Sequence, residues 1–177
     1  KAVIPLKNKY PAENIMIVFT GGEPLMRDDI AHCGMELRKN GFRWGMVTNG
    51  YAYDQSMHSQ LVSAGIGAIT LSLDGLEDNH NWLRGNPHAF DKALNALDLI
   101  NAYPRINSDV VSCINSRNIS ELPDIYDLLL NHKTKAWRLF TIAPIGRAAI
   151  NKDLQLNGDQ LKYLMDFICQ CRKDSKM

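Results

Sequence analysis

The sequence predicts an α/β fold, namely a partial, TIM-like (β/α) barrel of parallel strands that is incomplete at its N-terminus. Short apolar runs alternate with amphipathic segments along the chain, without low-complexity linkers, as is typical of βα units in a parallel sheet. The units repeat every ~25–35 residues, a spacing typical of βα barrels. Only five units are present, too few to close a barrel of eight strands. An open half-barrel fits this count, and a doubly wound sheet would fit it too.

The apolar runs predict strands at 15–19, 43–47, 67–73, 107–114 and 137–142. The first run consists mostly of β-branched and aromatic residues, which is typical of a strand buried in a parallel sheet. If an earlier strand belongs in front of it, the first strand has lost a neighbour and forms an exposed edge.

Helices are predicted at 28–40, 55–64, 87–102, 121–131 and 158–171. Asp54 is expected to cap the second helix and Gly65 to end it. Ser120 is expected to cap the fourth helix. Asn157 and Gln160 have the spacing of a capping box in front of the last helix. Each helix has one apolar face, as a helix that covers a sheet requires.

Length and charge exclude several classes of protein. A chain of 177 residues suffices for one domain with a sizeable core, so we expect a single domain over 1–177. The net charge of +1 gives no broad footprint for nucleic acid or anionic lipid. No apolar run approaches the roughly 18 residues of a membrane span. The cysteines lack C-x-x-C spacing and are expected to be reduced thiols in the cytoplasm; they are Cys33, Cys113, Cys169 and Cys171.

Two glycines follow the first strand at its carboxyl end, in the segment Gly21-Gly22-Glu23-Pro24. Without a Cβ, their backbone N–H groups can approach a ligand closely. Glu23 adds a carboxylate, and Thr48 offers a hydroxyl after the second strand. In α/β sheets, ligands bind beyond the carboxyl ends of the strands, so this segment is a candidate binding loop.

Further polar residues follow the third strand. Ser72 and Asp74 are two apart, so alternation directs them to the same side of the sheet; a turn closed by Gly75 is the alternative. Arg84 is a rigid fork of donors suited to a carboxylate or phosphate, or a solvated surface arginine. His80 is expected in a polar loop, as a surface histidine or a proton-transfer group.

The fourth and fifth strands also end in polar or turn-forming residues. Asn115 is expected either to present an amide to the site or to cap a turn. Ile145 could give a flat apolar contact to a purine edge, or belong to an ordinary loop. Because parallel strands share polarity, all five strand ends should meet at one edge of the sheet. Their joint inventory suits a zwitterionic amino acid that carries a ribose, with Glu23 toward an ammonium group and Arg84 toward a carboxylate.

Taken together, these motifs resemble the radical S-adenosylmethionine (radical SAM) enzymes. The resemblance rests on the order and spacing of residues 20–27, 48–50, 71–75, 84–85 and 144–148. More narrowly, the chain is similar to the SPASM branch, which carries C-terminal auxiliary iron–sulfur clusters and includes peptide and protein modifiers and haem-pathway enzymes.

The resemblance implies roles for individual residues. Gly21, Gly22 and Glu23 would lie along the methionine part of S-adenosylmethionine. Ser72 and Arg84 would bind its carboxylate or ribose.

Four further positions are weaker assignments from the same resemblance. Thr48 and Asp74 would contribute to the cofactor site, and Ile145 and Gly146 would contact adenine. The catalytic acid or base stays unassigned.

The resemblance also implies the reaction. A reduced [4Fe-4S] cluster cleaves S-adenosylmethionine to a 5′-deoxyadenosyl radical, which takes hydrogen from the substrate; a peptide or protein is the expected substrate class. A flavodoxin or ferredoxin is the expected electron donor. No nucleic acid or membrane partner is expected.

One motif of the family is missing. No C-x-x-x-C-x-x-C spacing exists in this sequence, so no metal ligands are assigned and the cluster cysteines are expected outside the chain. We expect a piece of such an enzyme without its N-terminal cluster loop and C-terminal auxiliary domain, inactive by itself, rather than a degenerate relative. The alternative function is a non-catalytic module of the same fold that binds a nucleoside or amino acid. An ordinary (β/α) isomerase or aldolase would need a catalytic lysine or carboxylate pair inside the barrel, and lysine is sparse at the strand ends.

Overall fold

All five strands in the computed structural model pair in parallel where pairing is described, and the described residues are 2–143, 145 and 152–174. The strands are β1 Met16–Phe19, β2 Arg43–Thr48, β3 Ala68–Ser72, β4 Asn107–Ile114 and β5 Trp137–Thr141. Each agrees with a predicted strand to within one or two residues. Strand β1 pairs with β2, β2 with β3, and β4 with β5. The strand positions predicted from apolar runs are therefore confirmed. The expected burial of the first strand is wrong, because β1 alternates between exposed and half-buried residues.

The α-helices include all five that the sequence predicts. They are α1 Ile30–Lys39, α2 Gln55–Ser63, α3 Glu77–Arg84, α4 Ala89–Asn101, α5 Leu122–Asn131 and α7 Gly158–Asp174. Short 3-10 helices occur at Ile4–Asn8, Ala12–Asn14, Pro24–Met26, Ile119–Glu121 and Lys152–Leu154. Helix α3 was not predicted. None of the helices in the described ranges is long and apolar enough to cross a lipid bilayer.

The chain divides into two compact units. Unit 1 contains Lys1–Leu71 and Lys92–Ser108, and unit 2 contains Ser72–Asp91 and Asp109–Met177. Unit 1 thus holds β1, β2 and most of β3 with α1 and α2, whereas unit 2 holds α3, most of β4, α5, β5 and α7. The expectation of one domain over 1–177 stays a prediction.

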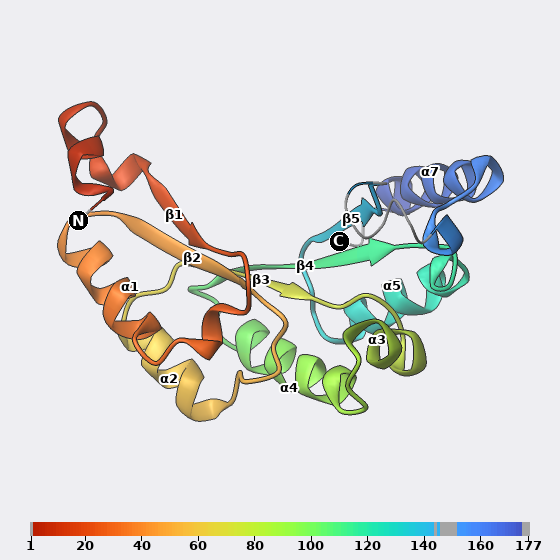
Figure 1. Ribbon diagram of the computed structural model, residues 1–177, viewed down its shortest axis with the longest axis horizontal. Helices are drawn as coiled ribbons and strands as arrows, with labels where there is room; N and C mark the ends of the chain where they lie inside the picture. The colour runs from red at the N-terminus through yellow and green to blue at the C-terminus, as the bar shows by residue number, and fades with distance from the viewer. Residues whose placement is uncertain (1, 144, 146–151, 175–177) are drawn as a thin grey trace. The chain divides into compact units, whose positions relative to one another are not determined.

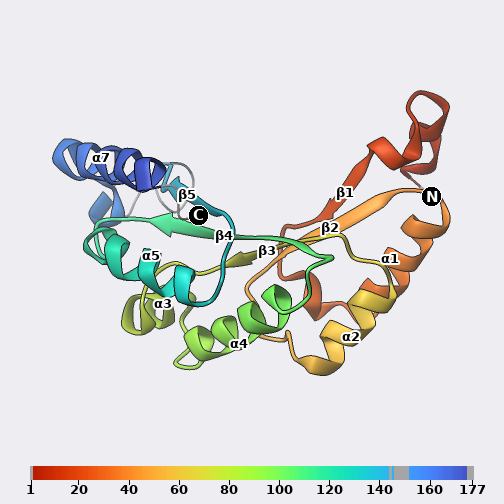
Figure 2. The same cartoon turned by 180° about the vertical axis from the view of Figure 1, so that it is seen from behind.

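In unit 1, α1 and α2 lie on the same side of the strands β1 and β2 (Figure 1). The view from behind gives the same arrangement (Figure 2). Trp44 and Met46 on β2 are each 1% exposed. A Cβ on Gly34 of α1 would lie 2.2 Å from Trp44 Cζ2, so only glycine lets this helix pack so closely on the indole ring.

Local capping signals in unit 1 act as the sequence indicates. The Asp54 carboxylate accepts a hydrogen bond from the backbone N–H of Met57, at 2.8 Å, and begins α2. Gly65 follows α2 with φ +79°, a left-handed conformation that glycine adopts without steric cost.

In unit 2, α7 packs on the end of β4 and on the start of α5. Ile114, Leu122 and Leu164 belong to one buried cluster, against which Trp137 and Phe167 pack. The predicted capping box at the start of α7 is confirmed: Gln160 N–H donates to Asn157 Oδ1 (2.9 Å), and Asn157 N–H donates to Gln160 Oε1 (3.0 Å). These reciprocal bonds satisfy two backbone donors at the helix start.

Two local predictions in unit 2 were wrong. Ser120 does not cap α5, because it lies inside the 3-10 helix Ile119–Glu121 and α5 begins at Leu122, with proline in its first turn. The polar loop expected around His80 is helix α3, which ends at Gly85 in the left-handed conformation (φ +65°). The start of α3 is held by a distant side chain: the Glu121 carboxylate accepts hydrogen bonds from Leu76 N–H (2.9 Å) and Asn79 Nδ2 (2.8 Å).

Candidate functional site: the glycine loop and the strand ends

The glycine loop after β1 presents open backbone. Gly21 and Gly22 are both exposed, and Gly21 has φ +115°. A Cβ added to either glycine would meet no atom within 4 Å. Open space beside the backbone fits a ligand that approaches the N–H and C=O groups closely, as the sequence predicts.

Glu23 ties the glycine loop to the end of β2. Its Oε1 accepts hydrogen bonds from Leu25 N–H (3.1 Å) and from the Thr48 hydroxyl (2.7 Å). Its Oε2 accepts one from Asn49 N–H (2.7 Å). We call this set the Glu23 clasp. Because a carboxylate can accept about four hydrogen bonds, the clasp leaves room on Oε2 for one further donor.

Thr48 is committed to the protein rather than to solvent. Its side chain is 1% exposed, and its hydroxyl donates to Glu23 and accepts from Gly50 N–H (3.1 Å). A direct contact between Thr48 and the cofactor does not fit this burial. Any influence of Thr48 on a ligand passes through Glu23.

In unit 2, Asp74 is a buried carboxylate beside an arginine. Asp74 is 3% exposed, and its Oδ1 accepts a hydrogen bond from Cys113 N–H (2.9 Å). Its Oδ2 lies 2.6 Å from Arg84 Nη2, although no hydrogen bond of favourable angle reaches Oδ2 from the described residues. The Arg84 side chain is 32% exposed. Arg84 therefore faces a protein carboxylate on one side and solvent on the other.

His80 is a buried acceptor, not a surface histidine. It is 1% exposed, lies on α3, and its Nδ1 accepts a hydrogen bond from Asp74 N–H (3.0 Å). Burial lowers the pKa of His80 from 6.5 to about 4; Asp74 opposes this shift and Arg84 adds to it. The neutral ring must carry its proton on Nε2, since Nδ1 accepts.

The asparagines after β4 organise a turn. Asn115 Oδ1 accepts from Arg117 N–H (3.0 Å), so the turn-capping alternative for Asn115 is the one found. Asn118 is 1% exposed, and its Nδ2 donates to the backbone carbonyls of Asp74 and Cys113. The contact of Asn118 with Asp74 was not predicted, because the two residues lie 44 positions apart in sequence.

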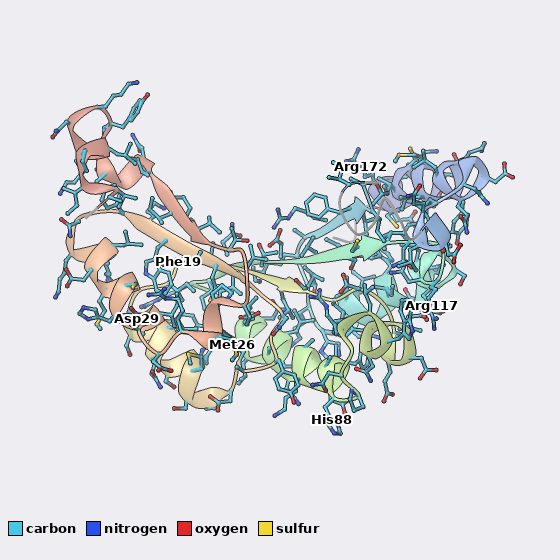
Figure 3. The ribbon with its side chains drawn as sticks, viewed as in Figure 1. Phe19, Met26, Asp29, His88, Arg117 and Arg172 are labelled. Atoms are coloured by element: carbon cyan, nitrogen blue, oxygen red, sulfur yellow. The ribbon has the colours of Figure 1, made fainter. Side chains whose placement is uncertain are left out.

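Arg117, which is labelled in Figure 3, packs over Trp82, an exposed tryptophan of α3. Its guanidinium carbon lies 4.0 Å from the centre of the Trp82 ring, within the range of a cation–π contact. Its Nε donates to Asn79 Oδ1 (3.1 Å). This contact accounts for Trp82 at the surface without a ligand.

Three other predicted residues are placed less fully. Ser72 ends β3 and is half-buried. Ile145 is 79% exposed. Gly146 lies outside the described residues.

The structure thus brings the predicted residues together in two groups. Unit 1 holds Gly21, Gly22, Glu23 and Thr48, and unit 2 holds Ser72, Asp74 and Arg84. Two hollows elsewhere, of about 490 and 520 Å³, are lined by none of them. Phe19 lines one of these and Arg172 the other (Figure 3).

The cysteines do not gather around a metal. Cys33, Cys113, Cys169 and Cys171 are free thiols, and burial raises the pKa of Cys113. Within the described ranges, no three His, Cys, Asp or Glu side chains lie close enough to hold a metal ion. These residues therefore supply no ligand set for a [4Fe-4S] cluster, which needs thiolates.

Sequence comparison matches the chain to a known family and to enzymes of that family. A profile described as Radical SAM superfamily matches residues 9–129. The Fe-coproporphyrin III synthase of Methanosarcina barkeri (strain Fusaro / DSM 804) is 31% identical, over 88% of this chain and 39% of the relative. The AdoMet-dependent heme synthase of Nitratidesulfovibrio vulgaris is 26% identical, over 93% of this chain and 45% of the relative. The chain spans less than half the length of these curated relatives.

Solved structures give the same answer for the fold. A structure of native anSMEcpe with bound AdoMet and Cp18Cys peptide has a TM-score of 0.79 at 21% identity, over 99% of this chain and 52% of the other. Coproporphyrinogen III oxidase (HemN) from Escherichia coli, a radical SAM enzyme, has a TM-score of 0.72 at 10% identity, over 89% and 40%. These likenesses confirm the predicted α/β partial barrel. The profile covers well over half of the sequence, and the predicted family is confirmed: the chain belongs to the Radical SAM superfamily.

Proposed function

We propose that this chain is the S-adenosylmethionine-binding core of a radical SAM enzyme. The observation that carries the proposal is the glycine loop, whose backbone is open at Gly21 and Gly22 and is held to β2 by the Glu23 clasp. Packing within the protein does not require glycine at either position, because a Cβ on Gly21 or Gly22 would meet no other atom within 4 Å. Close approach of a ligand to the backbone does require the absence of a side chain. Membership of the superfamily and the AdoMet-bound structures of anSMEcpe support the same ligand.

In this proposal each predicted site residue has a stated role toward S-adenosylmethionine. The backbone of Gly21 and Gly22 lies along the methionine part, and the free acceptor position on Glu23 Oε2 faces the ammonium group. Ser72 and the solvent-facing side of Arg84 bind the carboxylate or ribose. Thr48 supports Glu23 from the buried side.

The adenine contacts and the cluster ligands extend the proposal beyond these groups. Ile145 and Gly146 contact adenine. The [4Fe-4S] cluster takes its cysteines from outside the described residues. When bound and given one electron, by a flavodoxin or ferredoxin, S-adenosylmethionine supplies a carbon-centred radical that abstracts hydrogen; the protein positions and shields it.

The substrate class has two candidates. A peptide or protein is the first, supported by the fold likeness to anSMEcpe and to Streptococcus suis SuiB, each also solved with a peptide; the same likeness supports the auxiliary-cluster branch. A tetrapyrrole is the second, because two relatives of this chain are named Fe-coproporphyrin III synthase and AdoMet-dependent heme synthase.

The proposal is tested on the full-length product of the gene that encodes this chain. After anaerobic reconstitution, iron and sulfide per chain are measured, and the protein is mixed with S-adenosylmethionine and a reductant. We expect about four iron atoms per cluster and release of 5′-deoxyadenosine. Glu23→Ala should reduce that release, and Glu36→Gln, at an exposed carboxylate on α1, is the matched control.

Two negative results separate the alternatives. Binding of S-adenosylmethionine without iron uptake and without 5′-deoxyadenosine would favour the non-catalytic binding module. Absence of both binding and nucleoside release would end both readings.

A further inference from the structure

The Arg84 guanidinium has one ion-pair partner among the described residues, the carboxylate of Asp74. Its Nη2 lies 2.6 Å from Asp74 Oδ2, and no other ion pair of Arg84 is found within the described ranges. A guanidinium has five N–H donors in a planar fork, so the contact with Asp74 occupies a minority of them. The backbone at this point is also fixed, because Arg84 is the last residue of α3 and Gly85 ends the helix.

Asp74 is fixed from three directions. Its Oδ1 accepts from Cys113 N–H on β4, and its backbone N–H donates to His80 Nδ1 on α3. Its backbone carbonyl accepts from Asn118 Nδ2 in the loop after β4. Asp74 is 3% exposed, and these hydrogen bonds fix its position. An ion pair with Asp74 therefore restricts the position of the Arg84 guanidinium.

We propose that Asp74 is a positioning residue, whose buried carboxylate orients Arg84 so that the remaining donors of the guanidinium meet a ligand carboxylate. This inference rests on the proposed function and gives Asp74 a role in it that needs no contact with the ligand. An arginine that is already oriented loses less side-chain freedom on binding, which favours affinity.

The charge of Asp74 acts in the opposite direction. Its negative charge neutralises Arg84 and weakens the attraction between Arg84 and an anionic ligand. If charge neutralisation dominates, Asp74→Asn raises the affinity for S-adenosylmethionine; if orientation dominates, the same substitution lowers it. The sign of this one change therefore discriminates between the two effects.

The first measurement needs no ligand. Side-chain ¹⁵N spectra of arginine report whether rotation about the Nε–Cζ bond is slow, as it is in a tight ion pair. We expect separate Nη signals for Arg84 in the wild-type chain and averaged signals in Asp74→Asn. Asp109→Asn is the control, because Asp109 pairs with a different arginine, Arg138, and should leave the Arg84 signals unchanged. Unchanged Arg84 signals in Asp74→Asn would overturn the inference.

The second measurement compares two ligands by calorimetry, namely S-adenosylmethionine and its decarboxylated analogue. Asp74→Asn should lower the affinity for S-adenosylmethionine about tenfold, equivalent to 1.4 kcal/mol, and change the affinity for the analogue less than twofold. Equal losses for both ligands would mean that Asp74 contacts another part of the ligand, and a gain for S-adenosylmethionine would mean that charge dominates. Either result overturns the inference.

A variant that does not fold and a wild-type chain that does not bind each call for a second measurement. If Asp74→Asn does not fold, Arg84→Lys keeps the ion pair and removes the fork, and it should give the same loss confined to S-adenosylmethionine; equal losses for both ligands again contradict the inference. A wild-type chain that binds neither ligand refutes the proposed function and the ligand-facing half of this inference, and the ¹⁵N measurement then decides whether Asp74 orients Arg84.

Discussion

Removing the Glu23 carboxylate should destabilise unit 1. Glu23→Ala takes away three hydrogen bonds, at 2.7, 2.7 and 3.1 Å. A hydrogen bond to a charged group contributes about 1.5–3 kcal/mol, and water can replace the acceptor for the two backbone donors at this partly exposed site. The Thr48 hydroxyl is 1% exposed and loses its acceptor with little access to water. We expect the free energy of unfolding to fall by about 3 kcal/mol.

Glu23→Gln refines this estimate. The amide keeps one oxygen acceptor but presents an NH₂ group to a backbone N–H, so one charge-assisted bond is lost and two donors oppose each other. The expected loss is about 2 kcal/mol. Adding Thr48→Val to Glu23→Ala should cost less than the sum of the two single changes, because both remove the contact between Thr48 and Glu23.

Urea unfolding followed by far-UV circular dichroism measures these differences. Glu36→Gln is the matched control: its carboxylate forms an exposed ion pair with Lys39, with side chains 49% and 68% exposed, and exposed pairs contribute little. The control should stay within about 0.5 kcal/mol of wild type. A Glu23→Ala chain as stable as the control would refute the structural role of the clasp.

Three further predictions concern unit 2 and the glycine loop. His80 has its pKa lowered to about 4 by burial, so the unfolded chain binds more protons than the folded chain between about pH 6.5 and pH 4. The free energy of unfolding should be highest above pH 6.5 and decline as the pH falls toward 4. A pH series of urea midpoints should show this decline in wild type and not in His80→Gln, and a wild-type series that stays flat would contradict the prediction. Arg84→Ala should reduce stability by about 2 kcal/mol, because it leaves the buried Asp74 charge unpaired; a thermal melt equal to wild type would show that Asp74 needs no partner. Gly22→Ala should leave stability within about 0.5 kcal/mol, because a Cβ there meets no atom within 4 Å, yet lower the calorimetric affinity for S-adenosylmethionine; unchanged affinity would place the ligand elsewhere.

Local patterns predicted the elements that local physics decides. The β-branched run before Gly21 and the amphipathic stripe of α4 need only their own sequence to define a strand and a helix. The Asp54 cap and the capping box of Asn157 and Gln160 likewise join residues three positions apart. For these features, the interacting groups lie within a few residues of one another in the sequence.

Helix α3 could not be predicted from such patterns. It has eight residues and little apolar surface, and its first turn is held by Glu121, 45 residues from Leu76. The local signals, two acidic residues at its start and Gly85 at its end, were present but short. For the same reason, His80 was predicted to lie in a loop, because its burial depends on helix α3.

The candidate site shows the same division. The glycine pair was predicted from its own residue types, and it has the open backbone that those residues allow. The partners of the polar residues were not predicted: Thr48 contacts Glu23 across 25 residues, and Asp74 contacts Cys113 across 39. The ion pair between Arg84 and Asp74 was not predicted either.

The proposed function depends on binding of S-adenosylmethionine by the glycine loop of unit 1. Titration of the ¹⁵N-labelled chain with S-adenosylmethionine measures this binding through the amide signals of Gly21 and Gly22. We expect both signals to move along the titration with one shared dissociation constant. Signals of Gly21 and Gly22 that stay still at saturating ligand would show that the loop does not bind it.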